Sequence, residues 1–79
     1  MTLCQLKKGE TATIESINGK PSFKKRLFEL GFMKDTVLSV SFIAPFNGPI
    51  VVELRGYKLS LRISDAKKIV INKTEPVLI

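Results

Sequence analysis

Histidine and tryptophan are missing from this sequence of 79 residues, and cysteine occurs once, as Cys4. A lone cysteine cannot close an intramolecular disulfide, which favours a reducing, cytoplasmic setting. No run approaches the ~18 apolar residues that a membrane-spanning helix needs. The first residues also lack the basic and then apolar pattern of a signal peptide. These absences together predict a small cytoplasmic protein.

The same absences argue against a catalytic or metal centre. Zinc and ferrous sites draw on converging His, Cys and carboxylate ligands, whereas the 7 acidic residues here are dispersed along the chain. Cys4 has no histidine to activate it as a nucleophile, and no glycine-rich phosphate loop occurs. We therefore predict a protein that is not an enzyme and that has no metal site, no cofactor and no small-molecule substrate of its own.

Length and charge bound the remaining possibilities. A chain of 79 residues predicts a single domain over residues 1–79, with a core over about residues 6–72 and a tail over residues 73–79. The formal net charge is +6. Such a charge favours solubility, and it also suits contact with nucleic acid, an anionic membrane or an acidic protein surface.

One short helix is predicted near the start of the chain. Ser22 is a candidate N-cap for a helix over residues 23–30, and Gly31 stands where a helix ends in a left-handed residue. Phe28 is off the apolar stripe and is expected to cover an edge of the core. A helix this short is not stable alone in water, so it must pack on a sheet. Its stripe falls at i, i+4 and i+7, at Phe23, Leu27 and Leu30.

Alternating apolar residues predict five short strands, over residues 11–17, 36–44, 50–55, 57–63 and 68–72. A loop over residues 45–49 is expected to use Gly48 at positive φ, and residues 64–66 are expected to form a 3₁₀ corner before the last strand. This order predicts an all-β protein with one short helix, an SH3-like, partly open five-stranded barrel. The helix falls between the first and second strands, which favours this fold over the other five-stranded barrel, the OB-fold.

Basic and apolar residues outside the predicted core are candidates for contact with a partner. Lys24, Lys25 and Arg26 splay around the helix and cannot all face one ligand, so a solvated face is the alternative. Phe46, at the tip of a loop between prolines, either folds over the barrel mouth or is offered to a partner, together with an adaptable surface of Phe32 and Met33. The whole candidate set is Lys24, Lys25, Arg26, Phe32, Met33, Phe46, Lys58 and Arg62.

Several short motifs occur along the chain, namely Lys25-Arg26-Leu27, Leu30-Gly31-Phe32, Ala44-Pro45 with Gly48-Pro49-Ile50, Arg55-Gly56-Tyr57, Leu59-Ser60-Leu61-Arg62, Ala66 and Ile69. With these motifs, from about residue 6 to residue 71, the sequence resembles the FeoA family, the small cytoplasmic component of bacterial ferrous iron transport. It departs from the family where members often carry Pro-Gly after the Leu-Gly segment, because residues 33–35 read Met-Lys-Asp.

The resemblance implies an SH3-like barrel and a non-enzymatic accessory or regulatory role in ferrous iron uptake. The implied partner is FeoB, a membrane protein with a cytoplasmic GTP-binding domain, which would recruit this chain to the inner face of the membrane. Arg26 is then a candidate for an arginine finger supplied in trans.

Two alternatives remain, a basic nucleic-acid-binding barrel and a self-associating small barrel that forms a homo-oligomer. Nucleic-acid-binding barrels interleave exposed aromatic and basic residues. Phe42 and Tyr57 are expected on apolar faces, which makes nucleic acid the weaker alternative.

Overall fold

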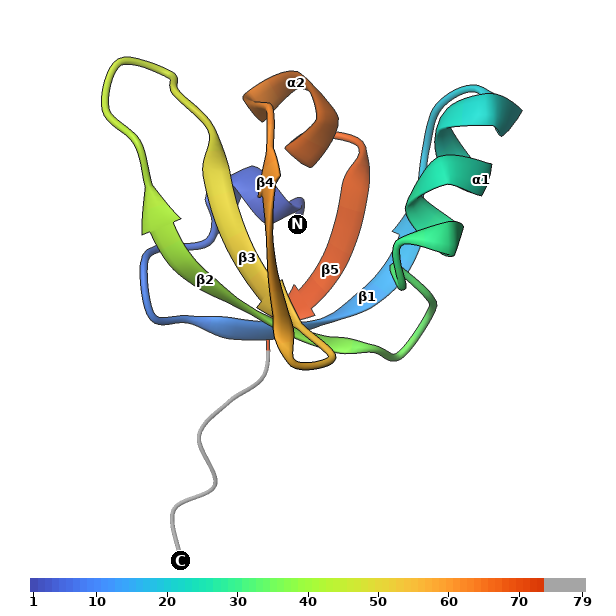
Figure 1. The fold of residues 1–79 in the computed structure, drawn as a ribbon, viewed down its shortest axis with the longest axis horizontal. Helices are drawn as coiled ribbons and strands as arrows, with labels where there is room; N and C mark the ends of the chain where they lie inside the picture. The colour runs from blue at the N-terminus through green and yellow to red at the C-terminus, as the bar shows by residue number, and fades with distance from the viewer. Residues whose placement is uncertain (74–79) are drawn as a thin grey trace, which may run out of the picture.

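The computed structural model describes residues 1–73. Five antiparallel strands form one sheet in the order β4-β3-β2-β1-β5, which curls into a partly open barrel (Figure 1). The predicted all-β architecture and the position of α1 between β1 and β2 are confirmed. The elements are η1 (Leu3–Gln5), β1 (Thr11–Ile17), α1 (Pro21–Glu29), β2 (Val37–Ile43), β3 (Ile50–Leu54), β4 (Tyr57–Leu61), α2 (Ile63–Ala66) and β5 (Ile69–Lys73).

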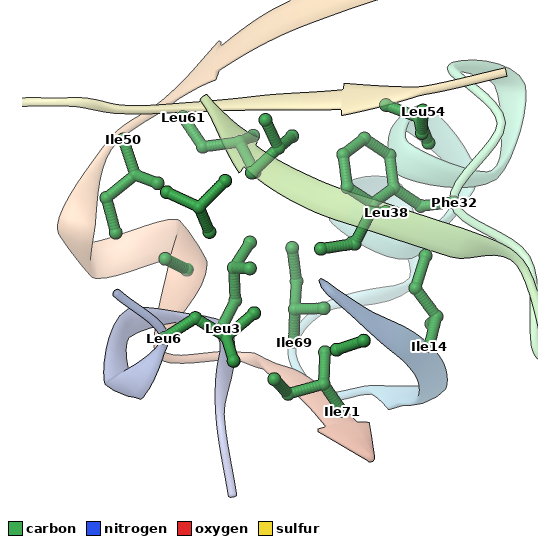
Figure 2. Close-up of a cluster of buried hydrophobic side chains, with 14 of the residues drawn as sticks. Leu3, Leu6, Ile14, Phe32, Leu38, Ile50, Leu54, Leu61, Ile69 and Ile71 are labelled. Atoms are coloured by element: carbon green, nitrogen blue, oxygen red, sulfur yellow. The ribbon is translucent and has the colours of Figure 1, made fainter. Parts of the chain in front are cut away.

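Inside the curl, aliphatic side chains from all five strands converge on one core (Figure 2). The core residues alternate along the strands, as in the pairs Ile69 with Ile71 and Leu38 with Val40, which are at most 2% exposed. Each fully buried side chain of this size contributes about 1.5–3 kcal/mol relative to exposure. The core therefore depends on the strands keeping their registers, because a slip by one residue would turn each strand's apolar face to solvent.

The N-terminal segment belongs to this core, which the sequence pattern did not predict. The carbonyl of Met1 accepts a hydrogen bond from the N–H of Ile71 at 2.9 Å, and Thr2 forms a β-bridge with Val70. These contacts hold η1 so that Leu3 is fully buried. The predicted core limits of residues 6–72 are therefore too narrow. Lys73 ends β5 rather than beginning a tail, and the rest of the predicted tail, residues 74–79, lies outside the described residues.

Helix α1 ends in a motif that folds the chain back onto the barrel. Gly31 has φ +100°, as predicted, and its N–H donates to the carbonyl of Phe28 at 3.0 Å. The N–H of Phe32 donates to the carbonyl of Leu27 at 2.9 Å, which completes a Schellman arrangement. The turn carries Phe32 into the core, where it is 1% exposed beside the fully buried Leu27.

The start of α1 differs from the prediction. The helix begins at Pro21 with Lys20 as N-cap, and no side chain caps it, so Ser22 lies inside the first turn. Proline suits this position because its missing N–H would have no partner in the first turn of a helix.

A β-bulge explains why the outer part of β2 differs from the prediction. The register between β2 and β3 shifts between Val40 and Phe42, so one extra residue turns the following side chains to the other face. Phe42 is 49% exposed and Ile43 is 38% exposed. Tyr57 is also 38% exposed. The expectation that Phe42 lies on an apolar face was therefore wrong, so Phe42 no longer argues against nucleic acid. Tyr57 lies opposite the buried Leu54 and so is on the apolar face, as expected.

The loop between β2 and β3 takes its turn at different residues from those predicted. Phe46 and Asn47 have φ +58° and +59°, whereas Gly48 does not have positive φ. Gly48 is needed for space instead, because a Cβ there would lie 2.6 Å from the Cβ of Ala44. The corner before β5 is also a single α-helical turn, α2, rather than a 3₁₀ turn.

The helices of the described chain are short. None of them, in residues 1–73, is both long and apolar enough to cross a membrane.

Removing the Leu3 side chain tests whether the N-terminal segment is part of the core. We expect Leu3→Ala to lower the free energy of unfolding by about 2–5 kcal/mol, because it opens a cavity in a filled interior. Urea unfolding measures the change. The control Phe46→Ala removes a side chain that is 98% exposed and should stay within about 0.5 kcal/mol of the wild type. A Leu3→Ala protein as stable as the control would contradict the burial of this segment.

An ion pair joins the turn before β1 to the end of β5. The carboxylate of Glu10 contacts the ammonium of Lys73 and accepts a hydrogen bond from the N–H of Lys7 at 2.7 Å. These two interactions, the one with Lys73 first, lower the pKa of Glu10 from its ordinary value of 4.5. The carboxylate form is thus favoured in the folded state, so Glu10 contributes stability above pH 4.5 that is lost as the pH falls through the lowered pKa.

We expect Glu10→Gln to be less stable than the wild type at pH 7, since the amide cannot pair with Lys73. The difference should shrink below pH 4.5 and vanish once Glu10 is protonated in both states. Urea midpoints measured across the acid range test this, with Glu29→Gln at the exposed end of α1 as control. A difference that does not change with pH would show that the charge is not the cause.

Candidate functional site

A groove runs between β1 and α1, with a volume of about 400 Å³. We call it the helix groove. Its apolar lining is formed by Ile14, Ile17, Phe28, Phe32 and Met33. Lys24, Lys25 and Lys34 also line it, and Glu15 is the acidic residue among the lining side chains. An apolar groove flanked by lysines offers burial to an apolar side chain and attraction to a carboxylate.

Phe28 is the prominent residue of this groove that the sequence interpretation missed. It was expected to cover an edge of the core, yet it is 61% exposed. Phe28 follows Leu27 by one residue, and a helix turns ~100° per residue, so it cannot share the buried stripe. The available signal was its spacing of four from Lys24, which places both on one helix face. No pattern in the sequence indicates that β1 forms the other wall of the groove, because β1 and α1 come together only in the folded chain.

A second groove, the seam groove, lies between α1 and β4 and is lined by Arg26, Leu30, Leu59, Arg62 and Asp65 among others. The guanidinium of Arg26 lies 3.9 Å from the carboxylate of Asp65 and 5.8 Å from the centre of the Phe23 ring. Arg26 thus lines a different groove from Lys24 and Lys25, in agreement with the prediction that the three cannot all face one ligand.

Of the remaining candidates, Phe46 and Lys58 lie outside both grooves, whereas Phe32 lies at the base of the helix groove. Phe46 is 98% exposed, so it is not folded over the barrel mouth. Its loop, between β2 and β3, lies on the opposite side of the barrel from α1 (Figure 1), so Phe46 and Met33 do not form the joint surface that was predicted. Phe32 is 1% exposed and can contribute only to the base of the helix groove. Lys58 is exposed on β4, opposite Glu53 of β3.

Potential metal ligands are dispersed in the folded chain as well. Within residues 1–73, no group of three His, Cys, Asp or Glu side chains lies close enough to hold a metal ion. Cys4 is half-buried, and its sulfur lies 3.1 Å from the hydroxyl of Thr2.

The comparisons with known proteins identify relatives. The model of the FeoA domain family matches residues 1–73. The Fe(2+) transport protein A/Fe(2+) transporter FeoB fusion protein of Porphyromonas gingivalis is 36% identical over 69 residues, which are 87% of this chain but 8% of the fusion protein. The putative Fe(2+) transport protein A of Campylobacter jejuni is 38% identical over 72 residues, 91% of this chain and 97% of that protein.

Solved structures of similar proteins share the fold. The FeoA protein of Chlorobium tepidum superposes with a TM-score of 0.88 at 32% identity, over 95% of this chain and 71% of that one. The FeoA protein of Stenotrophomonas maltophilia, complexed with zinc and described as a procaryotic SH3 domain protein, superposes with a TM-score of 0.79 at 32% identity, over 91% and 89%. The predicted SH3-like barrel is confirmed.

Ferrous ion added to the purified protein tests the dispersion of the ligands. Only a ligand that binds the native state raises its melting temperature, so we expect a change of less than about 1 °C at micromolar Fe²⁺ under anaerobic conditions. Differential scanning calorimetry measures it, with Mg²⁺ at the same concentration as control. A specific rise of ~4 °C, which corresponds to about 1 kcal/mol for a domain of this size, would demonstrate a site.

Proposed function

Since the chain belongs to the FeoA domain family, we propose that it is a non-enzymatic accessory protein of ferrous iron uptake. It acts by docking on the cytoplasmic GTP-binding part of a FeoB-type transporter. In this proposal the chain is cytoplasmic and is recruited to the inner face of the membrane by that partner. The resemblance noted in the sequence and the family match over residues 1–73 support the same assignment.

The observation that carries the proposal is the Porphyromonas gingivalis fusion protein, in which a relative of this chain is joined to an iron transporter. A covalent link turns binding into an intramolecular event at an effective concentration of about millimolar. A protein that works beside a transporter benefits from such a link, whereas one that works elsewhere in the cell would be misplaced by it. A separate chain must obtain the same proximity from its own surface.

The surface features of the chain suit contact rather than chemistry. The helix groove combines apolar and basic side chains, and the loop that carries the exposed Phe46 lies on the other side of the barrel (Figure 1). We assign Arg26 to contact rather than to a catalytic finger, because its guanidinium is already engaged by Asp65 and by the Phe23 ring.

Direct binding is the first test of this function. Isothermal titration of the chain into the cytoplasmic GTP-binding domain of the transporter from the same organism, loaded with GDP or with a non-hydrolysable GTP analogue, should show saturable binding. Heat that disappears between low and physiological salt would indicate a nonspecific electrostatic contact instead.

Tethering provides the functional test. In cells that lack the free chain, we expect Fe²⁺ uptake to fall, and to recover when the chain is either supplied separately or fused to the transporter. The matched control is a fusion of the similar domain of a manganese-dependent transcriptional repressor, which shares the fold with a TM-score of 0.84 at 23% identity. Radioactive iron uptake is the measurement. Full uptake without the chain, or recovery with the repressor domain, would overturn the proposed function.

A further inference from the structure

Strand β1 has a neighbour on both sides for only part of its length. It pairs with β2 through Thr13, whereas its pairing with β5 continues to Ile17. Beyond Thr13, the side of β1 that faces away from β5 is first closed by the chain before β2, since the N–H and C=O of Ile14 bond to Thr36 and Asp35 at 3.0 and 2.7 Å. From Glu15 onward, no strand within residues 1–73 pairs with this side.

The helix groove runs along this open edge. Residues 14–17 of β1 form one wall of the groove, and α1 with the residues after it forms the other. A β-bulge interrupts the alternation of side chains in this stretch, between Ile14 and Ser16. The groove lies on the side of β1 away from β5, where no strand within residues 1–73 pairs beyond Thr13. Figure 1 shows the same arrangement, with β5 on one side of β1 and α1 on the other.

The peptide groups of Ile17 point toward the groove. The N–H of Asn18 donates to the carbonyl of Lys68 at 2.7 Å, on the β5 side. Peptide groups of neighbouring residues in a strand point to opposite sides, so the N–H and C=O of Ile17 point away from β5. The N–H and C=O of Ile17 thus offer one hydrogen-bond donor and one acceptor, placed as they are for pairing with a neighbouring strand.

The opposite wall determines which segment fits. Phe28 and Met33 offer apolar contact, and the thioether of a methionine adapts to different side chains. Lys24, Lys25 and Lys34 outnumber the one carboxylate of the lining, Glu15. An incoming segment with both apolar and acidic residues would match this wall, whereas a second copy of the chain, at a formal net charge of +6, would be repelled.

We propose that the helix groove binds an extended segment of a partner protein as an added β-strand on the open edge of β1. The segment carries both apolar and acidic side chains, which match the apolar and the basic residues of the groove lining. The open stretch from Glu15 to Ile17 spans ~10 Å and accommodates about three residues. This inference rests on the proposed function, because we assign the bound segment to the cytoplasmic part of the transporter. The binding mode is strand addition, in which the main chain gives affinity and the side-chain pockets give specificity.

Amide exchange and matched variants test the proposal, with the cytoplasmic GTP-binding domain of the transporter as the probe. We expect the amide of Ile17 to exchange at least about tenfold more slowly in the complex, because it becomes hydrogen-bonded. Phe28→Ser and the double variant Lys24→Glu/Lys25→Glu should each weaken binding by about tenfold or more. All three positions are exposed, so the variants should remain folded.

The control variants repeat the two kinds of substitution, loss of an aromatic residue and reversal of a lysine's charge, at positions outside the groove. Phe42→Ser removes an exposed aromatic residue of β2 that does not line the helix groove, and Lys8→Glu reverses the charge of an exposed lysine in the turn before β1. Both should bind within about twofold of the wild type.

The outcomes separate the inference from the proposed function. If the domain binds the groove variants as well as the wild type, or if Phe42→Ser alone loses binding, the contact lies elsewhere, and the inference falls while the function stands. If the groove variants lose binding but the Ile17 amide is not protected, the occupant is not a strand, and strand addition is overturned. If the wild type binds neither the domain nor the complete transporter, the proposed function itself is overturned.

Discussion

The turn at Gly31, which returns the chain to the barrel after α1, is the constraint on which the rest of this structure depends. A helix of nine residues is too short to be stable in water, so its position must come from tertiary contacts. Leu27 supplies one contact, and the Schellman turn at Gly31 supplies the other by directing Phe32 into the core. Because Leu27 within the helix and Phe32 just after it are both buried, α1 is held at a fixed place beside β1. The helix groove exists only because the helix is held there.

Much of this architecture follows from local patterns in the sequence, and the rest follows from long-range geometry. The bounds of β1, the buried pair Ile69 and Ile71, and the left-handed Gly31 were predicted, since alternation and helix-end chemistry act over a few residues. The bulge that exposes Phe42 was not, because an extra residue in a ladder is visible only against the partner strand. The burial of Leu3 was missed for a related reason, as three residues of η1 are too few to show a period.

The sequence predicted which kinds of side chain could bind a partner, but not which of them lie together on one surface. Lys24, Lys25 and Met33 meet in the helix groove, whereas Arg26 and Phe46 lie elsewhere. A sequence shows which side chains are basic or apolar, but the grouping depends on which elements come together. A chain of this size thus presents several separate surfaces around one core, and the functional question becomes which of them a partner covers. Nucleic-acid binding and self-association stay the alternatives that the sequence left open.

The open edge of β1 also has a consequence for how the protein behaves in solution. An unpaired strand edge is a template for any other chain, including an identical one, and natural proteins guard such edges with bulges and lysines. Here the bulge lies at Glu15, between the pairings of Ile14 and Ser16, and lysines line the adjacent groove. Added salt weakens this guard, because it screens the repulsion between copies. We therefore expect concentrated samples to associate least at low ionic strength, the same condition that strengthens the attraction of an acidic segment to the groove.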